Sequence, residues 1–164
     1  MEELIGVFTY FDKQLQAETA VNKKKEILLR LFLIECKYNV DILDLIKSDG
    51  KNDDTQIHEI INLLSVGGIE RVISEKDTLV GDSFLIGLGG DIIKRLKTTD
   101  KENRDNKIEN IDDSIIFNIY KRMLVLKAIT KISKPYTAVK KINTLVRLKN
   151  LKKLLLIISK CNIK

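Results

Sequence analysis

The chain has 164 residues, the length of one domain, and 44% of them are hydrophobic while 32% are charged. This composition excludes a disordered chain, and a count of only two cysteines excludes a disulfide-stabilised fold. No apolar run approaches the length of about eighteen residues that a membrane-spanning helix needs.

The first predicted elements lie within residues 2–48, a segment without proline and with a single glycine. Its pattern is compatible with one long helix, but two helices with a break near residues 16–25 fit better. The second of these helices runs from about Lys24 to Lys47. Apolar residues at spacings of four and three predict its buried face. They are Ile27, Leu31, Ile34, Tyr38, Ile42 and Leu45.

A polar turn around Gly50 ends this helix, and Asp53 or Asp54 is expected to cap the next one. That third helix covers residues 55–75 and is predicted to bend at its two adjacent glycines. A fourth, shorter helical piece is predicted over residues 77–97, with a strip of small residues for close packing. The buried face of the third helix is predicted to comprise Ile57, Ile60, Ile61, Leu64, Gly68 and Val72.

Residues 98–113 are polar and predict an exposed loop, after which Asp112 or Asp113 caps a helix over residues 114–132. Pro135 starts the last helix, which extends to about Cys161. The short connection between these two helices predicts an antiparallel hairpin. We therefore predict a single all-α domain over residues 1–164, an antiparallel bundle of five or six helices. It comprises an acidic part (1–97), a polar loop (98–113) and a basic helical hairpin (114–164).

Charge is distributed unevenly along the chain. Residues 1–113 hold sixteen basic and twenty-three acidic side chains, whereas residues 114–164 hold thirteen basic and no acidic ones. The net charges of −7 and +13 together give the formal +6 of the whole chain. A stretch of this length without one acid is not expected by chance. We therefore expect negative charges, from the same chain or from a partner, to neutralise the basic hairpin.

Two cationic stripes are predicted on the hairpin. Lys127, Lys131 and Lys134 share one face of the first helix, since they are four and three residues apart. Lys149, Lys153 and Lys160 fall within about 40° of one another on the last helix. Opposite them, a buried face is predicted from Leu148, Leu151, Leu155 and Ile158.

Three interpretations of the stripes are open. In the first, acids of the same chain neutralise them, through surface ion pairs of small energy. In the second, they engage an acidic protein or a nucleic-acid backbone, and the excess of lysine over arginine then favours backbone contacts over base reading. In the third, the last helix lies on an anionic membrane surface. The second interpretation is the one we carry forward.

The sequence contains no motif that predicts an enzyme, a cofactor site or a metal site. His58 is the only histidine, and with Glu59 beside it the expected arrangement is a surface pair. Glu35, Asp41 and Asp44 share a side of the second helix, and a solvent-exposed polar face is the expected arrangement there. Neither Cys36 nor Cys161 has a histidine nearby in the sequence, so nucleophilic catalysis has no support.

We therefore expect a non-enzymatic interaction module, an accessory or regulatory subunit whose basic hairpin engages an acidic partner. The alternative is a self-associating helical bundle whose charges are satisfied internally or across a homodimer. The segment that begins the chain is acidic before it is apolar, unlike a secretion signal, and together with the few cysteines this predicts a cytoplasmic location.

Overall fold

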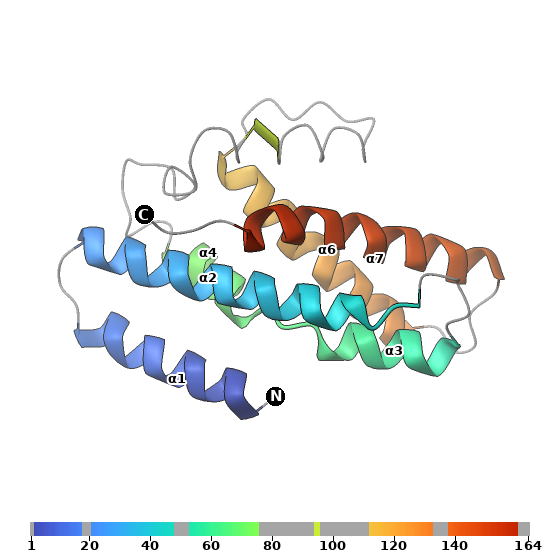
Figure 1. Ribbon diagram of the computed structural model, residues 1–164, viewed down its shortest axis with the longest axis horizontal. Helices are drawn as coiled ribbons and strands as arrows, with labels where there is room; N and C mark the ends of the chain where they lie inside the picture. The colour runs from blue at the N-terminus through green and yellow to red at the C-terminus, as the bar shows by residue number, and fades with distance from the viewer. Residues whose placement is uncertain are drawn as a thin grey trace.

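The computed structural model of the chain describes residues 2–17, 21–47, 53–75, 94–95, 112–132 and 138–160. Every regular element in these residues is helical, which confirms the predicted all-α bundle (Figure 1). Residues 98–111 of the predicted loop and most of the predicted fourth helix lie outside the described residues, as do Pro135 and Cys161. Residues 112 and 113, predicted to end the loop and cap the next helix, belong to the helix itself. The helices are α1 (Glu2–Ala17), α2 (Val21–Asp44), α3 (Asp54–Leu63), α4 (Gly67–Glu75), α6 (Asp112–Ile132) and α7 (Ala138–Ser159).

Helix α2 is the central element of the bundle. It packs against α1, α3, α4 and most extensively against α7. Figure 1 shows α1 and α7 running antiparallel to α2 on either side of it. The break predicted near residues 16–25 is confirmed, because α1 ends at Ala17 and α2 begins at Val21. The predicted C-terminal hairpin is confirmed as well, although α7 has more of its contacts with α2 than with α6.

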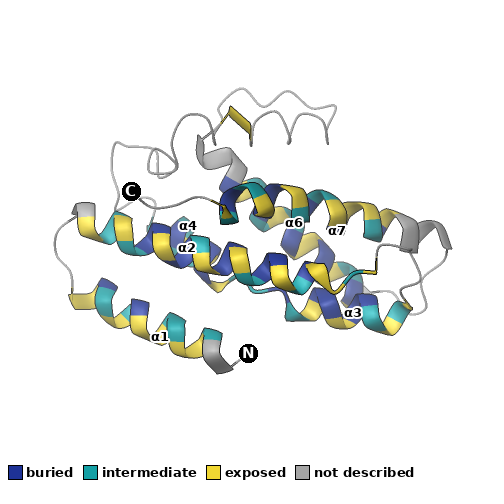
Figure 2. Cartoon of the chain, viewed as in Figure 1, coloured by how far each residue is buried: buried dark blue, intermediate teal, exposed yellow. Residues whose placement is uncertain are grey.

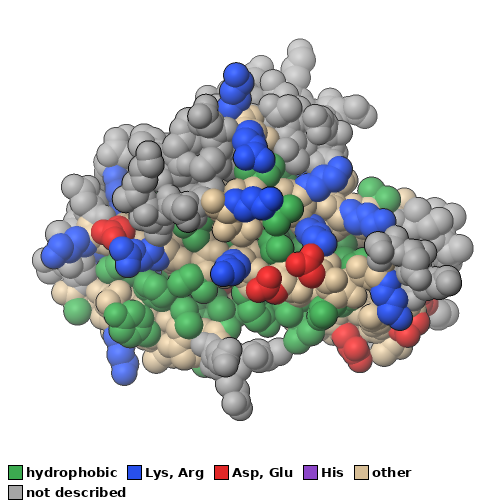
Figure 3. Space-filling model, viewed as in Figure 1, with side chains coloured by type: hydrophobic (Ala, Val, Ile, Leu, Met, Phe, Trp, Pro, Cys, Tyr) green, Lys and Arg blue, Asp and Glu red, His purple; other side chains and the backbone are tan. Residues whose placement is uncertain are grey.

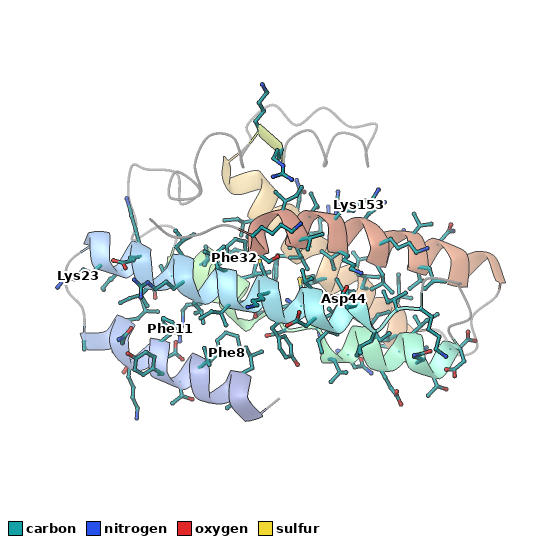
Figure 4. All side chains as sticks on the ribbon, viewed as in Figure 1. Phe8, Phe11, Lys23, Phe32, Asp44 and Lys153 are labelled. Atoms are coloured by element: carbon teal, nitrogen blue, oxygen red, sulfur yellow. The ribbon has the colours of Figure 1, made fainter. Side chains whose placement is uncertain are left out.

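The buried face of α2 differs from the predicted one. Ile34 and Leu45, two members of the predicted stripe, are 38% and 53% exposed. Leu31 is buried as predicted, and Ile27 and Ile42 are partly buried against the core. The core side chains come instead from a stripe rotated around the helix, dark blue in Figure 2. Phe32 points from α2 into this core, as Figure 4 shows. The buried stripe comprises Leu28, Phe32, Glu35, Asn39 and Leu43, all at 0% exposure.

The single bent helix predicted over residues 55–75 is wrong, since the structure has two helices there. Helix α3 ends at Leu63, and residues 64–66 are not helical before α4 begins at Gly67. The predicted buried positions of this segment are nevertheless all buried. The predicted cap is also present, because the Asp53 carboxylate accepts a hydrogen bond of 2.6 Å from the backbone N–H of Gln56.

Candidate functional site: a cationic face and a buried polar cluster

Helix α7 buries one apolar face and exposes three lysines on the opposite side, where the apolar residues Val146 and Leu156 are exposed as well. Leu148, Leu151, Leu155 and Ile158 are fully buried, as predicted. Lys149, Lys153 and Lys160 are all exposed, and at 100° per residue they lie about 180° from the centre of the buried face. Figure 4 shows Lys153 projecting from α7 on the side away from α2. This set of three lysines is called the α7 stripe below.

The acidic part of the chain compensates α7 only in part. Lys152, which flanks the stripe, forms an ion pair of 2.6 Å with Asp44 of α2. Figure 3 shows acidic side chains on the same face as the row of basic ones. Among the residues that the structure describes, however, none places a carboxylate within 4.0 Å of the three lysines of the stripe. Within the described residues, the stripe thus has no ion-pair partner.

The lysines of α6 are arranged differently. Lys127 is half-buried and its Nζ atom donates a hydrogen bond of 3.3 Å to the backbone carbonyl of Asn62 in α3. Burial lowers the pKa of Lys127, and the nearby charge of Lys131 lowers it further. Lys131 is exposed, and Lys134 lies outside the described residues. Lys127 thus belongs to the contact between α3 and α6.

His58 is buried, contrary to the expected surface pair with Glu59. Its Nδ1 atom lies 2.9 Å from the backbone carbonyl of Asp54, and its Nε2 atom lies 3.2 Å from that of Thr130. The residue follows Ile57 on the core side of α3 and so faces the last turns of α6. His58 connects two helices and is not positioned for catalysis on a substrate.

Glu35 is fully buried, contrary to the exposed polar face expected for it. One carboxylate oxygen, Oε1, accepts hydrogen bonds from the Ser65 hydroxyl at 2.7 Å and from the Gly68 N–H at 2.9 Å. The other oxygen, Oε2, accepts one from the Ile69 N–H at 2.7 Å. These N–H groups belong to the first turn of α4, which has no intrahelical partners for them. A carboxylate from α2 therefore caps α4 across the core.

Asn39, one turn after Glu35, holds the residue that precedes α4. Its Nδ2 group donates to the Ser65 carbonyl and its Oδ1 atom accepts from the Ser65 N–H, both at 2.8 Å. Because both backbone groups of Ser65 are paired with α2, the chain leaves the helical path between α3 and α4. We name Glu35, Asn39 and Ser65 the buried polar cluster.

Gly68 permits the close approach of this cluster to α4. A Cβ atom at this position would lie 3.0 Å from Oε2 of Glu35, closer than nearly all real Cβ contacts. Gly68 therefore serves the contact with the carboxylate, and the break in the helix lies just before the glycine pair. The sequence did contain a signal for the cluster, since Glu35 and Asn39 continue the spacing of Leu28 and Phe32.

Burial raises the pKa of Glu35 above the ordinary value of 4.5. The hydrogen bonds from Ser65, Gly68 and Ile69 oppose that rise, and the charge of Glu70 adds to it. The carboxylate has no exposed surface. Its chemistry is consequently structural, and it is not available to a solvent-borne substrate.

The raised pKa predicts a pH-dependent stability difference between the wild type and a Glu35→Gln variant. A raised pKa means that the folded protein binds this proton more tightly than the unfolded chain does, so the associated stability is present below pH 4.5 and lost at higher pH. In urea unfolding at a series of pH values, the free energy of unfolding of the wild type relative to the variant should fall above pH 4.5. A relative stability that rises with pH would contradict the assignment.

One hollow is lined by residues of α1, α2 and α4, and another by residues of α1 and α2. Both are lined by charged side chains that pair with one another: Asp12 with Arg71 in one, and Glu26 with Arg30 in the other. Within the described ranges, no group of three or more potential ligands is placed to hold a metal ion. None of the described helices is long and apolar enough to cross a membrane.

Comparisons of the chain with protein-family models, curated proteins and solved structures found no match. Function therefore has to be inferred from the surface of the molecule itself. Of the features described above, the α7 stripe is exposed and has no ion pair with any described carboxylate, whereas Glu35, Asn39 and His58 are buried.

Proposed function

We propose that the chain is a non-enzymatic interaction module that engages an acidic partner through its basic C-terminal hairpin. The observation that carries this proposal is the α7 stripe, in which Lys149, Lys153 and Lys160 are exposed opposite the core and have no described carboxylate beside them. Eleven residues separate the first and last of these lysines, which corresponds to a row of about 16 Å along the helix.

A row of lysines suits a repeating anion better than a single small one. Each ammonium group is a point charge that pairs with phosphate or carboxylate without the fixed geometry of an arginine. Such contacts bind a polymer backbone with little sequence preference, and they weaken as salt rises. The phosphate backbone of a nucleic acid is the concrete partner to test first, with an acidic polypeptide as the comparison.

The test is the binding of labelled mixed-sequence RNA and duplex DNA, measured by fluorescence anisotropy across a salt series. Log affinity should fall linearly with log salt concentration, with a slope of about −2.7 on DNA if three phosphates are neutralised. The double variant Lys149→Glu, Lys153→Glu should weaken binding and make the slope shallower by about 2. These exposed changes should leave the fold intact, which circular dichroism would verify.

A matched control distinguishes the stripe from net charge alone. The double variant Lys13→Glu, Lys37→Glu removes the same charge from exposed positions on α1 and α2. It should keep the wild-type slope. If both double variants lose the same affinity for nucleic acid, or if the wild type binds no nucleic acid even at low salt, the nucleic-acid proposal is contradicted. Salt-sensitive binding of polyglutamate in its place would identify an acidic protein as the partner class.

A further inference from the structure

One lysine of α7 is held by a carboxylate of α2. The Nζ atom of Lys152 lies 2.6 Å from Oδ1 of Asp44. Among the described residues, Lys152 is the one basic residue of α7 that pairs with an acid. Figure 4 shows Asp44 on α2 below α7 and Lys153 above α7. The ion pair therefore lies on the flank of α7 that faces α2, beside the α7 stripe.

Lys152 is close enough to the α7 stripe to belong to the same binding site. It follows Lys149 by three residues, which places the two side chains next to each other on the helix surface, about 60° apart. The side chains of Lys152 and Asp44 are 34% and 57% exposed, so water reaches both. A polyanion that lies along the stripe would pass within reach of Lys152 if Asp44 did not hold it.

The stability of the fold does not account for Asp44. It is the last residue of α2, and the last turn of this helix contains no basic residue. The C-terminal end of a helix carries partial negative charge, so a carboxylate at this position is unfavourable. An ion pair between exposed side chains contributes little to folding. The main effect of Asp44 is consequently on the positive charge of α7.

We propose that Asp44 competes with the polyanion for Lys152 and so lowers the affinity of the α7 stripe for its partner. This inference rests on the proposed function, because it concerns the regulation of the same site. The pair with Asp44 forms within the chain and needs no second molecule, whereas a phosphate would have to be brought to the flank of α7. Asp44 therefore retains Lys152, and the polyanion contacts the three lysines of the stripe.

The test is the Asp44→Asn variant, studied by fluorescence anisotropy with labelled mixed-sequence duplex DNA. At about 0.1 M salt its affinity should exceed that of the wild type by about two- to fivefold, because Lys152 becomes a fourth cation of the site. The slope of log affinity against log salt concentration should change from about −2.7 to about −3.6, the value for four neutralised phosphates. Circular dichroism should show an unchanged helix content.

The matched control is Asp41→Asn, which removes the same charge from the same helix. Asp41 is exposed three residues before Asp44, and it forms no ion pair with any described residue. Its replacement weakens the negative field near α7 but frees no lysine. The affinity should therefore rise less than in Asp44→Asn, and the salt slope should stay at the wild-type value.

A double-mutant cycle with Lys152→Gln isolates the pair. In the Lys152→Gln background, Asp44→Asn should raise the affinity no more than Asp41→Asn does, and it should leave the salt slope unchanged. An equal effect of Asp44→Asn with and without Lys152 would show that Asp44 acts only as a nearby negative charge, which contradicts the competition.

The same series distinguishes failure of this inference from failure of the proposed function. If Lys149→Glu, Lys153→Glu weakens binding but Asp44→Asn behaves as Asp41→Asn does, the stripe binds the polyanion and Asp44 does not regulate it. If DNA does not bind but polyglutamate does, the same cycle is measured with polyglutamate and is expected to show the same dependence on Lys152. If neither polyanion binds any of the variants, both the proposed function and the role of Asp44 are contradicted.

Discussion

At neutral pH, the free energy of unfolding of the Glu35→Ala variant is expected to be about 3–4 kcal/mol lower than that of the wild type. The change removes the acceptor of three buried hydrogen bonds, from Ser65, Gly68 and Ile69. Each unsatisfied buried donor costs about 1–3 kcal/mol of stability. The variant no longer has to bury a carboxylate, and the desolvation energy saved in this way offsets part of the total loss. Urea unfolding followed by circular dichroism would measure the difference.

The matched control for Glu35→Ala is Asp41→Ala on the same helix. Asp41 is exposed, and its removal should change the free energy of unfolding very little. If the two variants are equally stable, the carboxylate of Glu35 does not cap α4. Hydrogen exchange adds a local measure, because the N–H groups of Gly68 and Ile69 should lose protection before the rest of the bundle does.

The Asn39→Asp variant is expected to lose at least as much free energy of unfolding as Glu35→Ala does, although the side chain keeps its shape. The new carboxylate can still accept the hydrogen bond from the Ser65 N–H, but it places an oxygen against the Ser65 carbonyl where Nδ2 now donates. It also buries a negative charge one turn from Glu35, with no cation among its bonded partners. We expect a loss of about 3–5 kcal/mol at neutral pH.

The pH dependence of Asn39→Asp separates this mechanism from a general loss of packing. Burial raises the pKa of the new carboxyl above its unfolded value, so its cost to stability is present at high pH and shrinks as pH falls. A protonated carboxyl can donate to the Ser65 carbonyl as the amide does. The control Asn39→Ala leaves the same backbone groups unpaired and should show no such recovery. Equal pH profiles for the two variants would argue against the paired contact with Ser65.

The buried polar cluster also helps to position α6, through α4. It fixes the start of α4, and α4 packs against α6. The Tyr120 hydroxyl of α6 donates a hydrogen bond of 3.1 Å to Glu70 of α4. Loosening α4 should therefore perturb α6 before it perturbs α7, which rests chiefly on α2.

Local sequence pattern predicted the helices and two of the buried faces. Polar and glycine-containing segments separate apolar stretches with helical spacing, and these predicted the helices except for the break between α3 and α4, which the contact of Ser65 with Asn39 produces. The faces of α3 and α7 were predicted because each has one continuous stripe of large aliphatic residues, such as Ile57 and Ile61 or Leu148 and Leu155. In these helices hydrophobicity alone determines which side is buried.

The face of α2 was predicted only in part, because this helix has aliphatic residues on more than one side. Ile34 and Leu45 lie on one side and Leu28 and Leu43 on another, so periodicity alone does not select between them. The buried side of α2 is determined by how α3, α4 and α7 pack around it. The side with Glu35 and Asn39 is buried because these side chains form hydrogen bonds with backbone groups where α3 ends and α4 begins.

By itself, then, the sequence determined an all-helical chain and the concentration of basic residues, without one acid, in residues 114–164. Both follow from properties that residues carry locally, namely helical spacing and charge. Only the tertiary structure decided that Glu35, Asn39 and His58 are buried, that Lys127 faces α3, and that Phe117 and Leu124 remain exposed. The burial of polar side chains depends on which backbone groups in distant segments lack a hydrogen-bond partner. A polar side chain is buried where it can form a hydrogen bond with such a group.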